Sequence, residues 1–184
     1  MAWLIFLLGG IVLLVALVFF YYFNRFVLLG NRIDNSLSQI DVQLKRRADL
    51  IPNLIETVKG YAKHETAAIK AVTEARKAMV SASGVEKKIK ANEQLESALK
   101  TIFAIAEGYP DLKANTNFLE LQRELAATED RVAYSRQYYN DSILRYNDLC
   151  KAFPGLFFAR LYGKQPREYL KIAESERKAV KVDF

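Results

Sequence analysis

The chain has 184 residues, a formal net charge of +6, and a composition that is 51% hydrophobic. Its one cysteine, Cys150, excludes an intrachain disulfide, and its one histidine, His64, argues against a di-metal centre that needs two Glu-x-x-His motifs. A zinc site built from several Cys and His ligands is disfavoured for the same reason.

Residues 1–24 contain no charged side chain and predict a membrane anchor. As a helix at about 1.5 Å per residue, the apolar run would span roughly 30 Å, the thickness of a bilayer's hydrocarbon core. A cleaved signal peptide would need a positive N-terminal region and a small-residue cleavage site, and the sequence offers neither. The aromatic residues assigned to the anchor and its edges are Trp3, Phe19, Phe20, Tyr21, Tyr22 and Phe23.

Basic residues follow the anchor at Arg25, Arg32 and Lys45-Arg46-Arg47. The positive-inside rule therefore predicts a single-pass protein of the inner membrane, with its N-terminus outside and its bundle in the cytoplasm. The bias is small, so a bundle on the outer or periplasmic side is the alternative. Beside a bilayer, anionic lipid is a simpler partner for the basic excess than nucleic acid, for which no recognition motif is present.

Three helices are predicted in the first half of the soluble region. The first has an apolar stripe that keeps its phase across Pro52, which favours a bend over a stop. A break near Gly60 separates it from a second helix over about 65–81, although the two could also form one rod. The third helix covers about 86–107 and ends at Gly108-Tyr109-Pro110-Asp111. The predicted inward residues are Ile33, Leu37, Ile40, Leu44, Ala48, Ile51, Ile55, Val58 and Ala62 in the first helix, Ile69, Val72, Ala75 and Met79 in the second, and Leu95, Leu99, Ile102 and Ala106 in the third.

The fourth predicted helix runs from about residue 115 to Phe153, where Pro154-Gly155 ends it. Its inward stripe is Phe118, Leu121, Leu125, Thr128, Val132, Ser135, Tyr139, Ser142, Tyr146, Leu149 and Phe153. Asn117 and Glu120 have the spacing of a capping box at its start. No stretch alternates with period two, so we expect an all-α fold: an N-terminal transmembrane helix, an antiparallel up-and-down four-helix bundle over residues 25–172, and a short C-terminal helix within it. Residues 173–184 are predicted to form a charged tail.

Several motifs, in this order, resemble the LemA family over nearly the whole chain. They include Asn31-Arg32-Ile33-Asp34, the run 43–54, Tyr109-Pro110-Asp111, the run 129–136 and Tyr138-Tyr139-Asn140-Asp141. The resemblance implies a small membrane protein with an N-terminal helix and a helical bundle. It supplies no reaction and suggests a role in envelope processes or beside membrane proteases. The motif residues singled out are Pro52, Tyr109, Pro110, Arg131, Arg136, Tyr139, Asn140 and Pro154.

Side chains suited to catalysis are scarce. Cys150 adjoins the core stripe of the fourth helix and lies far in sequence from His64, so we expect a partly buried structural cysteine. Neither a Gly-rich phosphate loop nor a Gly-x-Ser-x-Gly motif occurs. The charged residues around Arg131 and Arg136 suit a solvated helix face, with a buried ion pair as the alternative. We therefore expect a non-enzymatic protein with no cofactor and no metal site.

Two surfaces are candidates for function. The first combines aromatic and basic residues after the fourth helix, and would either contact the membrane interface or cap the bundle. The second is a pair of tyrosines off the apolar stripe, suited to a protein interface. The first surface consists of Phe157, Phe158, Arg160, Leu161, Tyr162 and Lys164. The second consists of Tyr134 and Tyr138.

These features predict a membrane-anchored scaffold or adaptor of the bacterial cell envelope that self-associates and has a partner such as a membrane protease. The alternative is a membrane-organising or lipid-binding protein that acts through self-assembly and the basic aromatic segment. The sequence leaves the partner, the oligomer size and the biological process undetermined.

Overall fold

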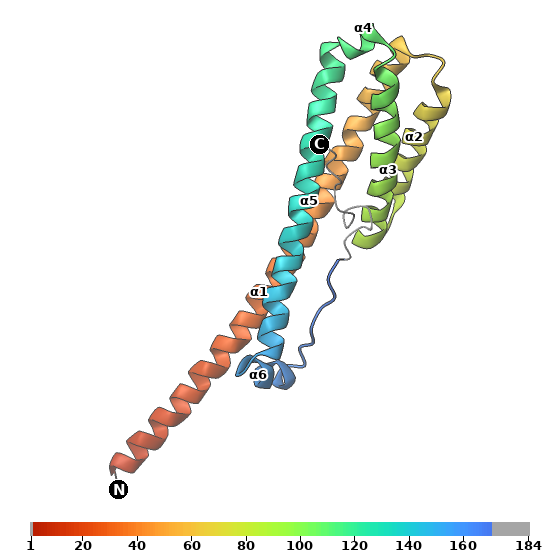
Figure 1. Cartoon of the computed structure of the whole chain (residues 1–184). Helices are drawn as coiled ribbons and strands as arrows, with labels where there is room; N and C mark the ends of the chain where they lie inside the picture. The colour runs from red at the N-terminus through yellow and green to blue at the C-terminus, as the bar shows by residue number, and fades with distance from the viewer. Residues whose placement is uncertain (1, 171–184) are drawn as a thin grey trace, which may run out of the picture. The chain divides into compact units, whose positions relative to one another are not determined.

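The computed structural model describes residues 2–170 and is helical almost throughout (Figure 1). No strand occurs in this range, which confirms the all-α prediction. The predicted tail 173–184 lies outside the described residues. The helices are α1 (Ala2–Tyr61), α2 (Thr66–Ser81), α3 (Val85–Ala106), α4 (Pro110–Lys113), α5 (Thr116–Lys151) and α6 (Gly155–Leu161).

The chain divides into two compact units, and α1 and α5 contribute residues to both. The anchor unit contains the described residues of 1–36 and 138–184. The bundle unit is residues 37–137. The region 25–172, predicted from sequence as one bundle, is thus shared between these units.

In the bundle unit, four helical segments joined by short loops form an up-and-down bundle (Figure 1). The segments come from α1, α2, α3 and α5. Their buried apolar residues recur at steps of three and four, which places one face of each segment inside. The predicted inward residues of α2 (Ile69, Val72, Ala75 and Met79) and of α3 (Leu95, Leu99, Ile102 and Ala106) are all buried.

Helix α1 continues through Pro52 and ends at Tyr61, so α1 and α2 are separate helices joined by a turn, in agreement with the break predicted near Gly60. The start of α5 differs from the prediction. The Asn115 side chain, rather than that of Asn117, caps α5 by accepting a hydrogen bond from the Phe118 amide at 3.0 Å. Asn115 is the capping residue because it directly precedes the first helical residue, Thr116, and an N-cap residue lies just outside the helix.

Helix α4 was not predicted. Pro110 occupies its first turn, where the missing amide hydrogen costs no helical bond.

The anchor unit is built from α1 up to Ser36, α5 from Tyr138, and α6. Its core includes Phe26, Leu29 and Ile33 from α1, Ile143, Tyr146 and Cys150 from α5, and Ala159 from α6. Phe153, expected to continue the buried stripe, is 89% exposed because α5 ends two residues before it, at Lys151. The stripe prediction was therefore wrong at its last position.

Two glycines shape the turns around α6. A Cβ at Gly155 would lie 2.2 Å from the carbonyl oxygen of Leu149, so only glycine permits this approach. Gly163 has a φ of 64° and ends α6, and the Lys164 amide donates to the Ala159 carbonyl at 2.8 Å. This is the hydrogen-bond pattern of a Schellman cap.

Candidate membrane-interface site

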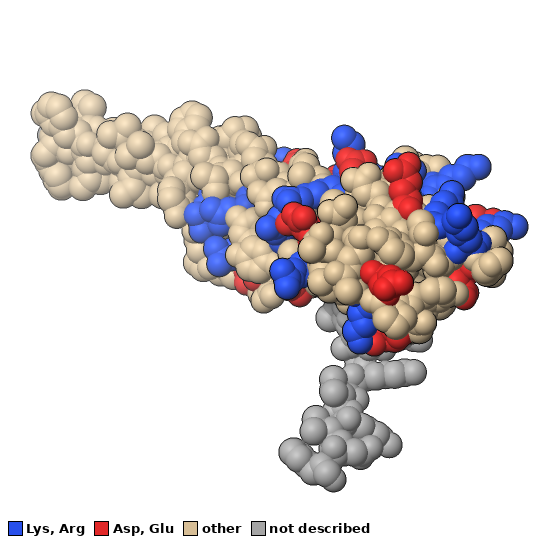
Figure 2. Space-filling view, turned by 90° about the horizontal axis from the view of Figure 1, so that it is seen from above, with Lys and Arg blue, Asp and Glu red and all other residues tan. Residues whose placement is uncertain are grey.

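The N-terminal part of α1 is the one helix, among the described residues, that is long and apolar enough to cross a membrane. None of its most apolar stretch is buried, whereas the core helix of a soluble protein would be mostly buried. On the face shown in Figure 2, this end of the chain carries no Lys, Arg, Asp or Glu, while charges of both signs gather over the rest. Both observations support single-pass anchoring in a membrane.

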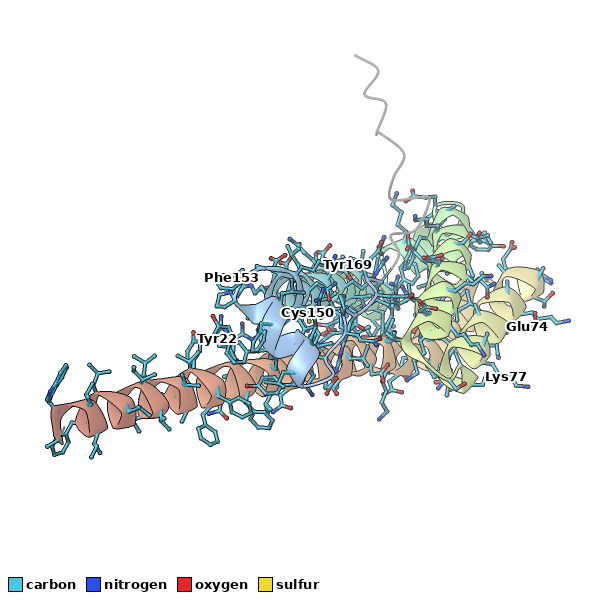
Figure 3. The ribbon with its side chains drawn as sticks, turned by 90° about the horizontal axis from the view of Figure 1, so that it is seen from below. Tyr22, Glu74, Lys77, Cys150, Phe153 and Tyr169 are labelled. Carbon is cyan, nitrogen blue, oxygen red and sulfur yellow. The ribbon has the colours of Figure 1, made fainter. Side chains whose placement is uncertain are left out.

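Helix α6 packs on α1 where the apolar segment ends. The Phe158 ring stacks on Tyr22, with centroids 4.5 Å apart and planes 6° apart. The Tyr162 hydroxyl donates to the Phe19 carbonyl at 2.7 Å, and its ring makes edge contacts with Phe23 and Phe26. Figure 3 labels Tyr22 on this stretch of α1. Part of the aromatic edge predicted for the anchor is therefore covered by the protein itself.

The other face of α6 is open. Phe157 is 63% exposed and Leu161 is 56% exposed, and Phe153, labelled in Figure 3, precedes them by one turn. Arg160 and Lys164 are also exposed. The structure thus divides the predicted aromatic surface: Phe158 and Tyr162 point into the protein, and Phe157, Arg160, Leu161 and Lys164 face outward.

Two asparagines of α5 hold the segment that follows α6. Asn147 accepts a hydrogen bond from the Arg167 amide and donates one to the Arg167 carbonyl, both at 2.8 Å. Asn140 makes the same pair of bonds with Leu170, at 3.0 Å and 3.2 Å. Because the asparagines are seven residues apart, they lie two turns apart on one face of α5. Together they satisfy both backbone groups of two residues that belong to no helix.

The Arg167 side chain completes this attachment. Its guanidinium pairs with Asp34 of α1 at 3.1 Å and lies 5.5 Å from the centroid of the Tyr146 ring. Residues 163–170 are therefore tied to both long helices within the anchor unit.

Cys150 is 3% exposed, so it is more fully buried than the partly buried cysteine expected from sequence. Burial raises the pKa of its thiol, an effect that the hydrogen bond with Tyr146 partly opposes. A thiol in this setting is a poor nucleophile because the thiolate is the reactive form.

An ion pair with one buried partner, Arg47, lies in the bundle unit. This side chain is 2% exposed, donates to the Asn92 side chain at 3.2 Å, and pairs with the Glu129 carboxylate at 3.4 Å. Its Nε has no hydrogen-bond partner within the described residues. Burial lowers the pKa of Arg47, whereas Glu129 and Glu96 act in the opposite direction.

The charge network continues from this pair. Glu96 accepts a hydrogen bond from Lys100. Partial burial, followed by the charge of Glu96, raises the pKa of Glu129. Arg47 was expected among the basic residues near the membrane and not in the core, yet its position three residues after Leu44 and four before Ile51 places it on the buried face.

An apolar groove of about 350 Å³ opens on the bundle unit between α1 and the ends of α2 and α3. Val42 and Val80 stand exposed at its edge, and Leu44, Ala48 and Met79 lie deeper. The polar residues around it are Asp41, Lys45 and Lys88, of which Asp41 and Lys88 form an ion pair at 3.0 Å.

The remaining predicted residues are distributed over both units. Tyr134 is 70% exposed and Tyr138 is 37% exposed. Arg131 is exposed, Arg136 is half-buried, and Tyr139 packs against the core of the anchor unit.

Among the other motif residues, the Tyr109 hydroxyl donates to Glu65 at 2.9 Å, and Pro154 follows a cis peptide bond just before α6. Within the described residues, no group of three or more His, Cys, Asp or Glu side chains is placed to hold a metal ion.

The fold and this site define a class: an all-helical protein held at a membrane by one N-terminal apolar helix. Residues 36–184 match the LemA family, and the chain belongs to that family. It is similar to Protein LemA of Metamycoplasma hominis, with 25% identity over 147 residues, which cover 77% of this chain and 67% of that protein.

Two magnetosome proteins are also similar. Magnetosome protein MamQ of Magnetospirillum gryphiswaldense is 24% identical over 173 residues, which cover 80% of this chain and 64% of MamQ. Magnetosome protein MamQ 2 of Paramagnetospirillum magneticum is 23% identical over 175 residues, which cover 81% of this chain and 64% of the relative. The match thus spans just under two thirds of each MamQ protein.

Proposed function

We propose that this protein is a non-enzymatic, membrane-anchored adaptor of the bacterial cell envelope that presents a helical bundle to another membrane protein. The observation that carries the proposal is the apolar groove of the bundle unit. Val42 and Val80 are exposed at the edge of this groove, although the rest of the bundle surface carries many charges. Exposed apolar side chains of this kind are favourable contacts for a partner protein. Because the apolar part of α1 holds the protein in the membrane, the bundle can meet other membrane proteins by diffusion in the plane of the bilayer.

The groove suits one apolar face of a partner helix. Helices bind such grooves through residues spaced three and four apart, and polar residues at the rim fix their register. Here Lys45 and the pair Asp41–Lys88 supply the polar rim. A membrane protease is one candidate partner, and we propose self-association through the exposed tyrosines Tyr134 and Tyr138 as a second property.

Photo-crosslinking of the full-length protein in its native membrane tests the adaptor. A photoreactive residue in place of Val80 samples the groove, one in place of Tyr134 samples the tyrosine surface, and one in place of Asp111, an exposed residue of α4, is the matched control. We expect one membrane protein to be joined reproducibly at Val80 and not at Asp111. Recovery of only lipid and copies of this chain would overturn the adaptor and favour a self-assembling, membrane-organising protein.

We also propose that the bundle is cytoplasmic, supported by the basic residues that follow the apolar segment. Asp111→Cys in a Cys150→Ser background gives one thiol on the bundle surface. A membrane-impermeant thiol reagent should leave it unlabelled in intact cells and label it after lysis. Labelling in intact cells would place the bundle on the outer or periplasmic side.

A further inference from the structure

The outward face of α6 forms an apolar row with no cover among the described residues. Phe157 and Leu161 lie four residues apart on the same side of α6 and are 63% and 56% exposed. Phe153, which is 89% exposed, lies in the turn just before α6. We call these three side chains the row. Large apolar side chains exposed together are costly in water and need an occupant.

The inner face of α6 fixes where this row lies along the apolar segment. Phe158 and Tyr162 contact α1 between Phe19 and Phe26, and no charged residue precedes Arg25. The row therefore stands beside the last turns of the membrane-spanning segment, at the depth where α1 leaves the hydrocarbon for the headgroups. Interfacial helices bury their apolar face roughly 5–10 Å into this layer.

The charges around the row have one sign. Between residues 149 and 167 the chain contains Lys151, Arg160, Lys164 and Arg167 and no acidic residue. On α1, Arg25 and Arg32 precede the first acid, Asp34. Arg167 is already paired with Asp34, which leaves Lys151, Arg160 and Lys164, all exposed. Arg160 lies between Phe157 and Leu161 in sequence, and Lys164 follows Leu161 by three residues. A cationic rim beside an apolar row is complementary to a surface of anionic phospholipid.

The row cannot easily turn inward to hide itself. Gly155 packs directly against Leu149, the Gly163 turn ends the helix, and the Asn147 clamp holds Arg167 beyond it. Both ends of α6 are thus fixed, and its outward face is preorganised. A preorganised surface loses little conformational freedom when it binds.

We propose that α6 is a second membrane contact, in which Phe153, Phe157 and Leu161 enter the interfacial layer of the same leaflet that α1 leaves, and Arg160 and Lys164 bind anionic phospholipid headgroups. The occupant of the row is therefore lipid. This inference rests on the membrane anchor and is independent of the adaptor proposal, because none of the residues proposed to contact lipid lines the groove.

Tryptophan fluorescence of the full-length protein in liposomes tests this proposal. The native tryptophan is removed by Trp3→Phe, and Phe157→Trp then reports on the row. Val80→Trp in the same background is the matched control, because Val80 is equally exposed, at 63%, and belongs to the bundle unit. The liposomes contain phosphatidylcholine and phosphatidylglycerol, with bromine atoms on the acyl chains near the headgroup as quenchers.

We expect the Phe157→Trp emission to shift to shorter wavelength and to be quenched by the brominated lipid, and the Val80→Trp emission to remain unquenched. If Phe157→Trp is unquenched and open to acrylamide in water, the proposal fails. If it is shielded from acrylamide and still unquenched by lipid, a protein covers the row and the proposal also fails. Leu161→Trp repeats the test at an independent position, and circular dichroism checks that the helical content is unchanged.

The headgroup specificity has its own test. With Arg160→Gln and Lys164→Gln added, quenching of Phe157→Trp should no longer increase when phosphatidylglycerol replaces part of the phosphatidylcholine, whereas it should increase when both basic residues are present. Each basic residue near an anionic surface contributes about fivefold to the apparent affinity for that surface. An identical phosphatidylglycerol response in both proteins would overturn the role assigned to Arg160 and Lys164.

Discussion

The two units of this protein bury polar groups in different ways. In the bundle unit the buried polar side chains include a charged one, Arg47, which is 2% exposed and pairs with the partly exposed Glu129. In the anchor unit, Asn147 is 3% exposed and binds backbone groups through a neutral amide. Among its described residues, the anchor unit has no buried charged side chain and so avoids the desolvation cost of one. In the bundle unit that cost is offset by a network in which Glu129 is in contact with water.

The difference shows what each arrangement achieves. The Arg47 network joins α1, α3 and α5 through side chains, so it favours one register among helices that apolar packing alone would permit to slide. The asparagines satisfy the backbone of residues 163–170, which have no helical hydrogen bonds of their own. One device selects a helix arrangement, and the other attaches a non-helical segment.

The largest expected effect follows from Arg47→Ala. This change removes a large buried side chain and leaves Asn92 without its partner, so the free energy of unfolding should fall by about 3 kcal/mol. Denaturant unfolding followed by circular dichroism measures the loss, and hydrogen exchange should increase within residues 37–137. Arg47→Met, which keeps much of the volume, should cost about 1 kcal/mol. Equal losses in the two variants would mean that the charge, rather than the volume, stabilises the bundle.

Gly155→Ala should have the next largest effect, in the anchor unit. The added Cβ would meet the Leu149 backbone, so the start of α6 must move, at a cost of about 2 kcal/mol. Hydrogen exchange should increase in α6 and in residues 163–170. Gly30→Ala is the control within the same unit, because Gly30 is helical and has open space around it, and it should be neutral or slightly stabilising. Unchanged exchange in Gly155→Ala would show that α6 is not held by this contact.

Asn147→Ala should cost about 1.5 kcal/mol, because the backbone amide and carbonyl of Arg167 both lose their partner. The direct measurement is faster exchange of the Arg167 amide. Asn147→Asp retains the acceptor for the Arg167 amide and loses the donor to the Arg167 carbonyl. In this variant the exchange rate of the Arg167 amide should therefore lie between the rates in the native protein and in Asn147→Ala. An Arg167 amide that stays protected in Asn147→Ala would refute the clamp.

The smallest expected effect is a pH dependence of stability that arises from Glu129 in the charged network. Because the pKa of Glu129 is raised in the folded state, the native protein binds its proton more tightly than the unfolded chain. The stabilisation from this group is therefore fully present below its unfolded value of 4.5 and is lost as the pH rises through the folded pKa.

Since Glu129 is about half exposed, the difference should be below about 1 kcal/mol. The free energy of unfolding, measured from below pH 4.5 upward, should show this decline in the native protein and not in Glu129→Gln. The same decline in both proteins would assign it to another group.

Local pattern was enough to predict much of this fold. The length of the apolar run predicted the anchor, and the apolar spacing predicted the inward faces of α2 and α3. Gly108 and Pro110 marked the end of α3 because their backbone preferences act within a few residues. The caps and the short α4 were less predictable, since neighbouring residues compete for the same backbone groups.

The candidate site depended on partners far apart in the chain. Arg47 contacts residues 45 and 82 positions away, and Tyr162 contacts Phe19 across 143 positions. The composition of 153–170 predicted an aromatic and basic surface, but not which aromatics would face the protein.

The sequence by itself therefore determined the anchor, the helices and the apolar faces, because hydrophobic periodicity acts locally. Only the tertiary structure decided that Arg47 is buried, that α6 has one covered and one open face, and that asparagines hold the segment after it. Each of these depends on which residues from distant parts of the chain are available to pair with a charge, to pack against an aromatic ring or to accept and donate backbone hydrogen bonds.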